Sequence, residues 1–233
     1  IDCEVLSINS KELDLRNSLD VDNWFKDNKP DTVFLAAAKV GGILANSNYP
    51  ADFLIDNLLI QNSVISSAFK HKVNKLMFLG SSCIYPRAAK QPIKENALLT
   101  GKLEPTNEAY AIAKIAGIKL CQFYRKQHGV DFISVMPTNL YGPGDNFHSQ
   151  NSHVVAALIL KFYEAAKQKK EEVILWGTGS PLREFMHVDD LAGGLIFLME
   201  NYSENEHINI GTGKEISIIE FAKIIKDISG WQG

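Results

Sequence analysis

Tyr110 and Lys114 stand four residues apart in a stretch whose apolar spacing predicts a helix, so both side chains are expected on one helix face. A tyrosine hydroxyl has an ordinary pKa of ~10 and exchanges protons poorly at neutral pH. A neighbouring lysine ammonium favours the phenolate and is therefore expected to lower that pKa. If the hydroxyl of Ser81 hydrogen-bonds the substrate oxygen, the three groups can move a proton to or from a carbonyl while a nicotinamide carries hydride. The Tyr-x-x-x-Lys spacing alone could come from a pair of surface residues. The serine at a strand end and the alternation of strands and helices around the pair favour catalysis.

The elements that must position these residues alternate between short β-rich runs and longer helical stretches. The predicted strands cover residues 3–8, 32–37, 75–80, 132–136, 173–176 and 208–210. The predicted helices cover residues 54–70, 109–127, 154–167, 191–200 and 218–228. Strands that are apolar almost throughout are buried on both faces, which is typical of a parallel sheet between helices. The sequence therefore predicts an α/β fold.

The residues that follow three of these strands are small, polar or turn-forming. They cover positions 36–42, 80–86 and 137–144. Ligands of open α/β sheets bind outside the carboxyl ends of the strands, where small residues let a planar group or a phosphate approach the backbone. Strands must end in turns in any case, but three such ends in succession favour a ligand site.

Six segments resemble the extended short-chain dehydrogenase/reductases that act on nucleotide sugars. They are AAAKVGG (36–42), GSSCIYP (80–86), EPTNEAYAIAKIAG (104–117), SVMPTNLYGP (134–143), DNFH with NSH (145–148, 151–153) and REFMHVDD (183–190). The resemblance implies a Rossmann-type doubly wound parallel sheet with a smaller α+β substrate domain. It places the dinucleotide-binding domain at 1–140 and the substrate domain mainly at 141–233, with about 187–210 returning to the first. The implied reaction converts GDP-4-keto-6-deoxy-D-mannose to GDP-L-fucose by 3,5-epimerisation and 4-keto reduction.

The epimerisation needs a base and an acid, because a ketone at C4 acidifies the hydrogens on C3 and C5. Cys83 is a candidate base, since the pKa of a thiol can fall next to a cation or a hydrogen-bond donor; the alternative is a small buried apolar residue. The resemblance identifies His153 as the proton donor, in competition with His148 and His187. A structural role suits His187 better, because residues 189–190 are predicted to cap the helix that follows.

The same resemblance places Lys161, Trp176 and Arg183 on the nucleotide sugar. A guanidinium such as that of Arg183 can bind a diphosphate through paired hydrogen bonds. Trp176 could cover a ring face or pack in the core. Lys161 stands where many relatives carry arginine, so it would keep the charge and lose the paired geometry.

The expected cofactor is NADP(H), and no metal is expected. NAD-specific sites usually end the relevant strand with a carboxylate, whereas residues 7–11 contain no acid and end in Lys11. Lys11 is the candidate for the 2′-phosphate, because the family often carries an arginine where this chain has Ser10. Asp14 and Leu15 resemble the pair that meets the adenine, although Asp14 could equally be a turn residue. The resemblance implies the other cofactor contacts, which are Ala36, Ala37, Leu79, Gly80, Ser82, Lys114, Pro137, Thr138, Asn139, Leu140 and His153.

Composition excludes several other classes of protein. The 233 residues are 45% hydrophobic, which supports a packed core and excludes intrinsic disorder. With 24 basic and 27 acidic residues, the net charge of −3 provides no electrostatic footprint for nucleic acid. The longest apolar run, residues 191–199, is far short of the ~20 needed to span a bilayer. Three irregularly spaced cysteines indicate free thiols in a reducing cytosol. A cytoplasmic enzyme is expected, as a homodimer in which the long helices at 54–70 and 109–127 could pair.

The length of the chain indicates part of a longer enzyme. The first predicted strand resembles the second strand of the family, and the Gly-x-x-Gly-x-x-Gly turn that seats a pyrophosphate is missing. The C-terminal part of the substrate domain is also expected to be missing, and the 233 residues alone are expected to bind cofactor poorly. The alternatives are a nucleotide-sugar 4-epimerase, a 4,6-dehydratase or a non-catalytic nucleotide-binding relative. A dehydratase is expected to carry an Asp-Glu pair near the serine, where Cys83 and Ile84 stand.

Overall fold

The computed structural model describes residues 3–147 and 152–233. Its main layer is a four-stranded sheet in the order β1-β2-β3-β6. The strands are β1 (Thr32–Leu35), β2 (Lys75–Leu79), β3 (Asp131–Pro137) and β6 (Ile208–Ile210). All neighbouring pairs are parallel, so the carboxyl ends of the strands meet at one edge. The apolar pattern of these segments predicted this arrangement.

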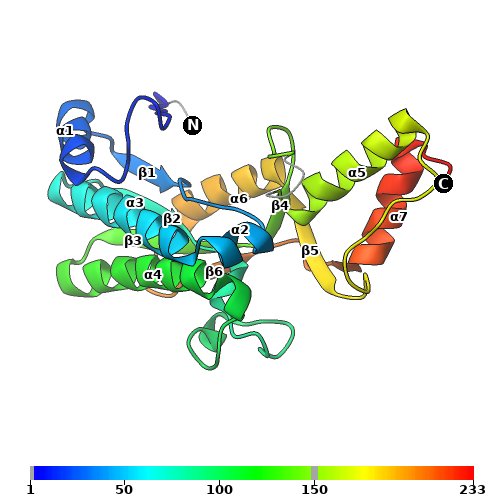
Figure 1. The fold of residues 1–233 in the computed structure, drawn as a ribbon. Helices are drawn as coiled ribbons and strands as arrows, with labels where there is room; N and C mark the ends of the chain where they lie inside the picture. The colour runs from blue at the N-terminus through cyan, green and yellow to red at the C-terminus, as the bar shows by residue number, and fades with distance from the viewer. Residues whose placement is uncertain (1–2, 148–151) are drawn as a thin grey trace.

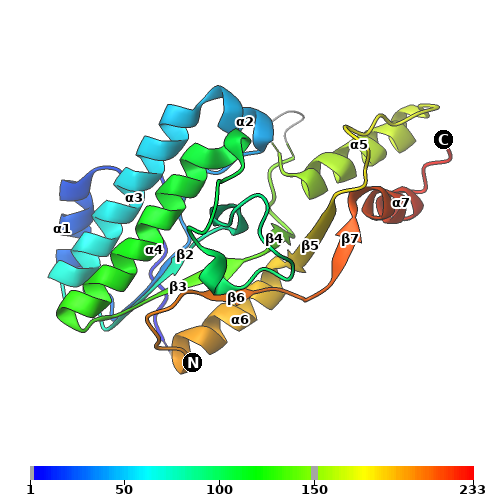
Figure 2. The same cartoon turned by 90° about the horizontal axis from the view of Figure 1, so that it is seen from below.

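Helices cover both faces of the sheet. Three of them, α1 (Ser18–Asn28), α3 (Pro50–Lys70) and α4 (Glu108–His128), lie side by side on one face, and α6 (Val188–Asn201) covers the other (Figures 1 and 2). The core on the first face contains Phe78, Phe132, Ile65 and Ile118, each almost fully buried. On the second face, Leu198 of α6 belongs to the cluster that also contains Met77, Ile133 and Val135. These two layers confirm the predicted doubly wound α/β fold.

Short elements connect the layers near the carboxyl edge of the sheet. The helix α2 (Ile43–Asn48) precedes α3, and three single 3₁₀ turns lie between β2 and α4: η1 (Ser82–Ile84), η2 (Glu95–Ala97) and η3 (Pro105–Asn107). Pro105 and Thr106 therefore form a separate turn immediately before α4, which begins at Glu108.

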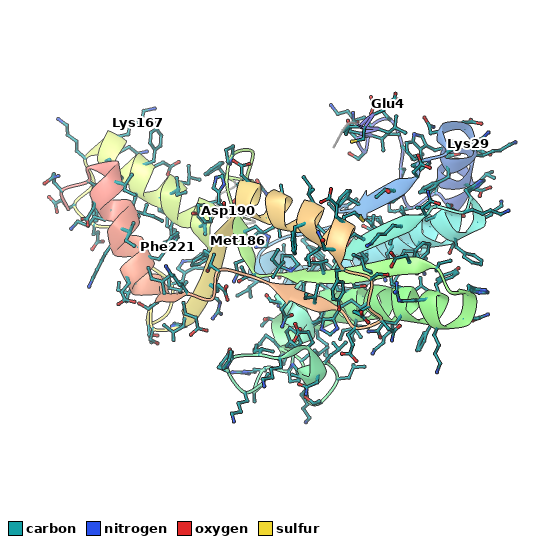
Figure 3. The ribbon with its side chains drawn as sticks, turned by 180° about the vertical axis from the view of Figure 1, so that it is seen from behind. Glu4, Lys29, Lys167, Met186, Asp190 and Phe221 are labelled. Atoms are coloured by element: carbon teal, nitrogen blue, oxygen red, sulfur yellow. The ribbon has the colours of Figure 1, made fainter. Side chains whose placement is uncertain are left out.

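A smaller part of the molecule projects beyond this edge (Figure 1). Its strands are β4 (Asn139–Tyr141), parallel to β5 (Leu182–His187), and β7 (Glu215–Ser217), antiparallel to β5. Its helices are α5 (Val154–Gln168) and α7 (Ile218–Ser229), and α7 begins with a capping box between Ser217 and Glu220. Phe221, labelled on α7 in Figure 3, stacks on Phe185 of β5 with ring centroids 4.7 Å apart. None of the helices in the described part of the chain combines the length and hydrophobicity that crossing a membrane requires.

Two of the six predicted strands are wrong. Residues 3–8 contain no regular strand, and Val5 is 79% exposed. Residues 173–176 alternate between packed and exposed side chains as a strand would, with Val173 packed against the α5–α7 cluster and Trp176 72% exposed. A strand, however, needs backbone hydrogen bonds to a neighbour, and among residues 3–147 and 152–233 no segment pairs with either run. Their side-chain pattern was suitable, but pairing partners decide strand formation.

The start of α6 also differs from the prediction. The helix begins at Val188, and its N-cap is His187, whose Nδ1 accepts a hydrogen bond from the Asp189 N–H at 3.2 Å. Asp189 and Asp190 lie in the first turn, where carboxylates favour the positive end of the helix dipole. The structural role predicted for His187 is confirmed, whereas the predicted capping by residues 189–190 is wrong.

The packing of α4 on the sheet depends on Gly117. A Cβ at this position would lie 2.4 Å from Cζ of Phe78 and 2.9 Å from Oε1 of Gln61, which donates from Nε2 to the Ala113 carbonyl. We predict that Gly117→Ala lowers the free energy of unfolding by about 1–3 kcal/mol through overpacking. Gly193, in α6, is the matched control, because a Cβ there meets nothing within 4 Å. Gly193→Ala should raise stability by about 0.5–1 kcal/mol. Urea denaturation of both variants checks this, and a stabilised Gly117→Ala variant would contradict the packing argument.

Candidate active site

Ser81, Cys83, Tyr110 and Lys114 come together where β2 ends. The Gly80 N–H donates to the Val135 carbonyl at 2.9 Å and so extends the sheet hydrogen bonding by one residue before the chain turns into η1. A Cβ on Gly80 would lie 2.3 Å from Cε of Met136, so a larger residue here would require the end of that side chain to move. The 28 residues between Ser81 and Tyr110 return through the three short turns to the N-terminal end of α4.

Lys114 extends from the helix back to the sheet. Its Nζ donates to the Leu79 carbonyl at 2.8 Å and lies 4.7 Å from the ring centroid of Phe78 and 5.8 Å from that of Tyr110. The residue is 3% exposed. The i, i+4 spacing thus places both side chains on one helix face, as predicted.

The pKa of Tyr110 shifts in the opposite direction from the one predicted. Burial raises the pKa of Tyr110 well above its usual range, the nearby Cys83 thiolate raises it further, and hydrogen bonding with Ser81 lowers it. A lowering of the Tyr110 pKa by Lys114 was predicted. This prediction is wrong, because the cost of removing the phenolate from water exceeds the lowering of the pKa by Ser81. Tyr110 therefore holds its proton at neutral pH, which is the form a proton donor needs.

Burial dominates the other two titrating groups as well. Burial raises the pKa of the Cys83 thiol, while hydrogen bonding with Ser81 and the charge of Lys114 lower it. The expectation of a lowered thiol pKa is thus wrong in direction, although both groups that act to lower it are present. Burial lowers the pKa of Lys114 to about 8, and the Cys83 charge acts in the opposite direction. Ser81 therefore acts on both the thiol and the phenol, and the charge of Lys114 acts on the thiol.

The pKa of Lys114 predicts a pH dependence of stability. Its value falls from 10.5 to about 8 on folding, so between these values the unfolded chain holds a proton that the folded chain has released. Stability therefore rises with pH in this window, by about 2 kcal/mol from pH 8 to pH 10 for this group alone. We expect that rise in urea denaturation of the unmodified chain relative to Lys114→Met. Lys126→Met removes an exposed lysine from the same helix and is the matched control. Parallel pH profiles for the unmodified chain and Lys114→Met would contradict the prediction.

Residues that the sequence did not single out hold Tyr110 in place. Phe53 of α3 is 3% exposed and meets the Tyr110 ring edge-on, with centroids 6.4 Å apart. Asn57 fixes the loop after β1, since its Oδ1 accepts from the Lys39 N–H at 2.9 Å and its Nδ2 donates to the carbonyls of Lys39 and Phe53. A Cβ on Gly41 of this loop would lie 3.0 Å from Cζ of Phe53. A polar residue at a buried helix position was the one signal for Asn57; Phe53 had none.

The expected cofactor contacts that follow β1, β2 and β3 lie at the same edge of the sheet. Ala36, Ala37 and Ser82 are exposed where β1 and β2 end, although Leu35 and the middle of β2 are buried. The hydroxyl of Thr138 and the Nδ2 of Asn139 both donate to the Glu184 carbonyl of β5, which joins the end of β3 to the smaller part of the molecule. An open platform of small residues at the carboxyl edge fits a dinucleotide. The described residues contain no cluster of three or more His, Cys, Asp or Glu that could hold a metal ion.

The N-terminal candidates lie in a separate turn. Lys11 is exposed, and its N–H donates to Oδ1 of Asn9 at 2.9 Å. The carboxylate of Asp14 is bound by Arg16, with Nε to Oδ1 at 2.9 Å and an NH2 to Oδ2 at 2.8 Å. This pairing lowers the pKa of Asp14 to about 2. Leu15 packs against the main core.

His153 is exposed at the N-cap position of α5. Within the described ranges it makes no hydrogen bond with Ser81, Cys83 or Tyr110. His148, its competitor, lies outside the described residues. A base and an acid that act on opposite faces of one sugar ring are separated by that ring, so direct contact between Cys83 and His153 is not required.

The structure brings two of the three expected substrate residues together. Nζ of Lys161 lies 5.0 Å from the ring centroid of Trp176 and donates to the Ile174 carbonyl at 3.0 Å. Because Trp176 is 72% exposed, the alternative of core packing is excluded. Arg183 is exposed on β5, and its guanidinium is bound only to the Leu182 carbonyl of its own strand among the described contacts.

The sequence and the fold were compared with those of known proteins. Residues 3–211 match the model of the NAD dependent epimerase/dehydratase family. The chain is 63% identical over 222 residues to GDP-L-fucose synthase 1 of Arabidopsis thaliana, covering 95% of the chain and 69% of that protein. It is 53% identical over 241 residues to GDP-L-fucose synthase of Escherichia coli K12, covering 100% and 75%. A solved GDP-L-fucose synthetase from Naegleria fowleri, bound to NADP, superposes with a TM-score of 0.89 at 33% identity, covering 97% and 70% of the two chains.

Proposed function

Because the chain belongs to the NAD-dependent epimerase/dehydratase family and, within it, to the GDP-L-fucose synthases, we infer that it converts GDP-4-keto-6-deoxy-D-mannose to GDP-L-fucose with NADPH. The observation that carries this function is the group of Ser81, Cys83, Tyr110 and Lys114 at the carboxyl edge of the sheet. One part of this group suits removal of a carbon-bound proton, and the other suits protonation of a carbonyl oxygen. Epimerisation and reduction at one sugar need both.

The cofactor binds across the open edge of the sheet in this proposal. When bound, NADPH supplies hydride to C4 of the sugar. Ala36 and Ala37 allow close approach, Leu79, Gly80 and Ser82 line the end of β2, and residues 137–140 line the end of β3. Lys114 and His153 border the same space. Lys11 takes the 2′-phosphate, while Asp14 and Leu15 lie at the adenine; Asp14 must then share its carboxylate with Arg16.

Epimerisation begins at Cys83. Its thiolate removes the hydrogen from C3 or C5, and the electrons move into the C4 carbonyl to give an enolate of the sugar. His153 returns a proton to the opposite ring face, which inverts the centre. The charge of Lys114 and the hydroxyl of Ser81 lower the thiol pKa against the effect of burial, so both support thiolate formation.

Reduction follows at the same carbonyl. Ser81 hydrogen-bonds the C4 oxygen, and the neutral Tyr110 hydroxyl donates its proton to that oxygen as hydride arrives. Burial, which keeps Tyr110 protonated, favours this direction of the reaction. Lys114 holds its ammonium against the Leu79 carbonyl and lowers the cost of a negative charge at the site.

The GDP part of the substrate lies over the smaller part of the molecule. We assign Arg183 and Lys161 to its charged groups and Trp176 to a ring face. Lys161 lies against the Trp176 ring and so adds a charge next to a stacking surface. The domains 1–140 and 141–233, with about 187–210 in the first, then contribute cofactor and substrate contacts respectively.

Assembly and location complete the proposal. Apolar side chains remain exposed on α3 and α4, among them Ile55 at 50%, Ile112 at 45% and Phe123 at 60%. A homodimer that pairs these helices would cover them. Cys3, Cys83 and Cys121 are free thiols, which suits a cytoplasmic enzyme.

The proposed activity predicts NADPH oxidation that depends on the 4-keto sugar. We expect the nicotinamide absorbance to fall when the complete enzyme receives GDP-4-keto-6-deoxy-D-mannose and NADPH, and the product to have the configuration of GDP-L-fucose. UDP-glucose, which lacks the ketone, is the control and should leave NADPH unchanged. If the 4-keto sugar also left NADPH unchanged, the proposed function would be wrong.

A further inference from the structure

We propose that Tyr85 is a positioning residue for Cys83. Its hydroxyl fixes the η1 turn, so that the Cys83 thiol lies where C3 and C5 of the sugar are deprotonated. The inference rests on the proposed function, because it requires Cys83 to be the base. Tyr85 follows the η1 turn directly and lies two residues beyond Cys83. It has no part in the chemical steps described above.

The hydroxyl of Tyr85 belongs to a buried hydrogen-bonded group that spans distant parts of the chain. It donates to Oδ1 of Asn209 at 2.5 Å and lies 2.9 Å from Nε2 of His207. Tyr85 is 6% exposed and His207 is 3% exposed. Asn209 is fixed in turn, because its N–H donates to Oε1 of Glu95 at 2.9 Å and its Nδ2 donates to the Ile93 carbonyl at 3.2 Å.

The direction of these hydrogen bonds follows from the atoms involved. Oδ1 of Asn209 can only accept, so the single proton of the Tyr85 hydroxyl is used there. Nε2 of His207 must therefore carry a hydrogen and donate to the Tyr85 oxygen. Burial lowers the pKa of His207, so the neutral ring with its proton on Nε2 fits this arrangement. Asn209 and His207 each make one hydrogen bond with the Tyr85 hydroxyl.

This group ties the turn that carries Cys83 to the sheet. Before the turn, Gly80 is bonded to Val135 of β3; after it, Ile84 is fully buried and Tyr85 is anchored to β6. Asn209 pairs with Met136 in the parallel register of β3 and β6. The three-residue turn is thus held at both ends by the same part of the sheet, and the hydroxyl provides the second of these anchors.

Tyr110 and Lys114 have separate supports. Tyr110 contacts Phe53 of α3, and Lys114 is bonded to the Leu79 carbonyl before the turn begins. Loss of the Tyr85 hydroxyl should therefore displace the thiol more than Tyr110 and Lys114. A displacement of about 1 Å can cost on the order of 100-fold in rate. The inference thus predicts a selective loss of epimerisation.

The test is Tyr85→Phe in the purified enzyme, with two rates measured on each protein. Incorporation of solvent deuterium at C3 and C5 of GDP-4-keto-6-deoxy-D-mannose without NADPH reports Cys83 chemistry by NMR. Reduction of the same ketone in a single turnover with NADPH, analysed for all C4-reduced products, reports Tyr110 chemistry. We expect exchange to fall about 10–100-fold and total reduction to change less than about 3-fold. Tyr202→Phe is the matched control, since its hydroxyl donates to the Glu206 carbonyl at 2.7 Å at the other end of the sheet.

Each outcome decides a separate question. If the unmodified enzyme exchanges no deuterium, the proposed function fails; if it does exchange and Tyr85→Phe exchanges equally fast, the positioning role fails. Equal losses of exchange and reduction would show a general structural role and overturn the inference. If thermal melting shows that Tyr85→Phe is unfolded, two variants of His207 replace it in the test. His207→Gln keeps a hydrogen-bond donor near the Nε2 position, and His207→Leu removes the donor. Faster exchange by the Gln variant supports the inference, and equal exchange by the two variants contradicts it.

Discussion

Tyr110→Phe should lower the rate of NADPH oxidation with the 4-keto sugar by about 10²–10⁴-fold, the usual contribution of a general acid. The substitution removes one hydroxyl and keeps the ring against Phe53, so the packing of the site is retained. Burial keeps Tyr110 protonated in the folded chain, and Ser81 is close enough to act on its pKa. Deuterium exchange at C3 and C5 should continue, because Cys83 removes those hydrogens without the phenol.

Tyr124→Phe provides the control for this experiment. Tyr124 lies on the same helix and packs its ring on Phe69, with centroids 4.8 Å apart, away from the catalytic group. Its variant should oxidise NADPH within about 2-fold of the unmodified enzyme, as for a substitution outside the site. A Tyr110→Phe enzyme that kept more than about a tenth of the rate could not be using Tyr110 as its general acid.

Apolar periodicity predicted a strand correctly wherever the predicted segment had a neighbouring strand to pair with. The four strands of the main sheet and the five longer helices were predicted within a few residues. Residues 3–8 and 173–176 show the limit of that reasoning, because a strand pattern describes side chains and says nothing about a neighbouring backbone. The strands β4, β5 and β7 and the helices α1 and α2 were not predicted. These segments are short or of mixed polarity, so their apolar residues show no clear period.

The members of the catalytic group were predictable, but their electrostatics were not. Helical spacing places Tyr110 and Lys114 on one face, and the end of β2 places Ser81 and Cys83 beside them. Pairwise reasoning from charges then gives the wrong direction for the pKa of Tyr110, because it omits the cost of burial. How far a group is buried depends on tertiary packing, which a local pattern does not contain.

Lys114 connects the two halves of the reaction. Its charge stabilises the Cys83 thiolate during epimerisation, yet burial has brought its own pKa to about 8. Loss of that proton would remove the cationic support of the thiolate, so thiolate formation and Lys114 protonation favour each other. The site thus retains one positive charge near neutral pH for a step that creates a negative one.

Cys83→Ser should abolish the fucose configuration of the product while NADPH oxidation continues at a residual rate. A serine hydroxyl is a far weaker acid than a thiol, and burial at this position already disfavours an anion. Deuterium exchange at C3 and C5 should therefore fall by about 10²–10⁴-fold, as expected for loss of a general base. Tyr110, Lys114 and Ser81 remain, so the ketone can still be reduced before its neighbouring centres are inverted.

Cys3→Ser is the matched substitution, because Cys3 is an exposed free thiol outside the catalytic group. It should leave both deuterium exchange and product configuration unchanged, whereas formation of normal GDP-L-fucose by Cys83→Ser would exclude Cys83 as the base. The two principal variants also test each other. If Tyr110 and Cys83 act in separate steps, Tyr110→Phe exchanges deuterium without reducing and Cys83→Ser reduces without exchanging. Such opposite losses cannot arise from general damage to one shared pocket, which would slow both steps in both variants.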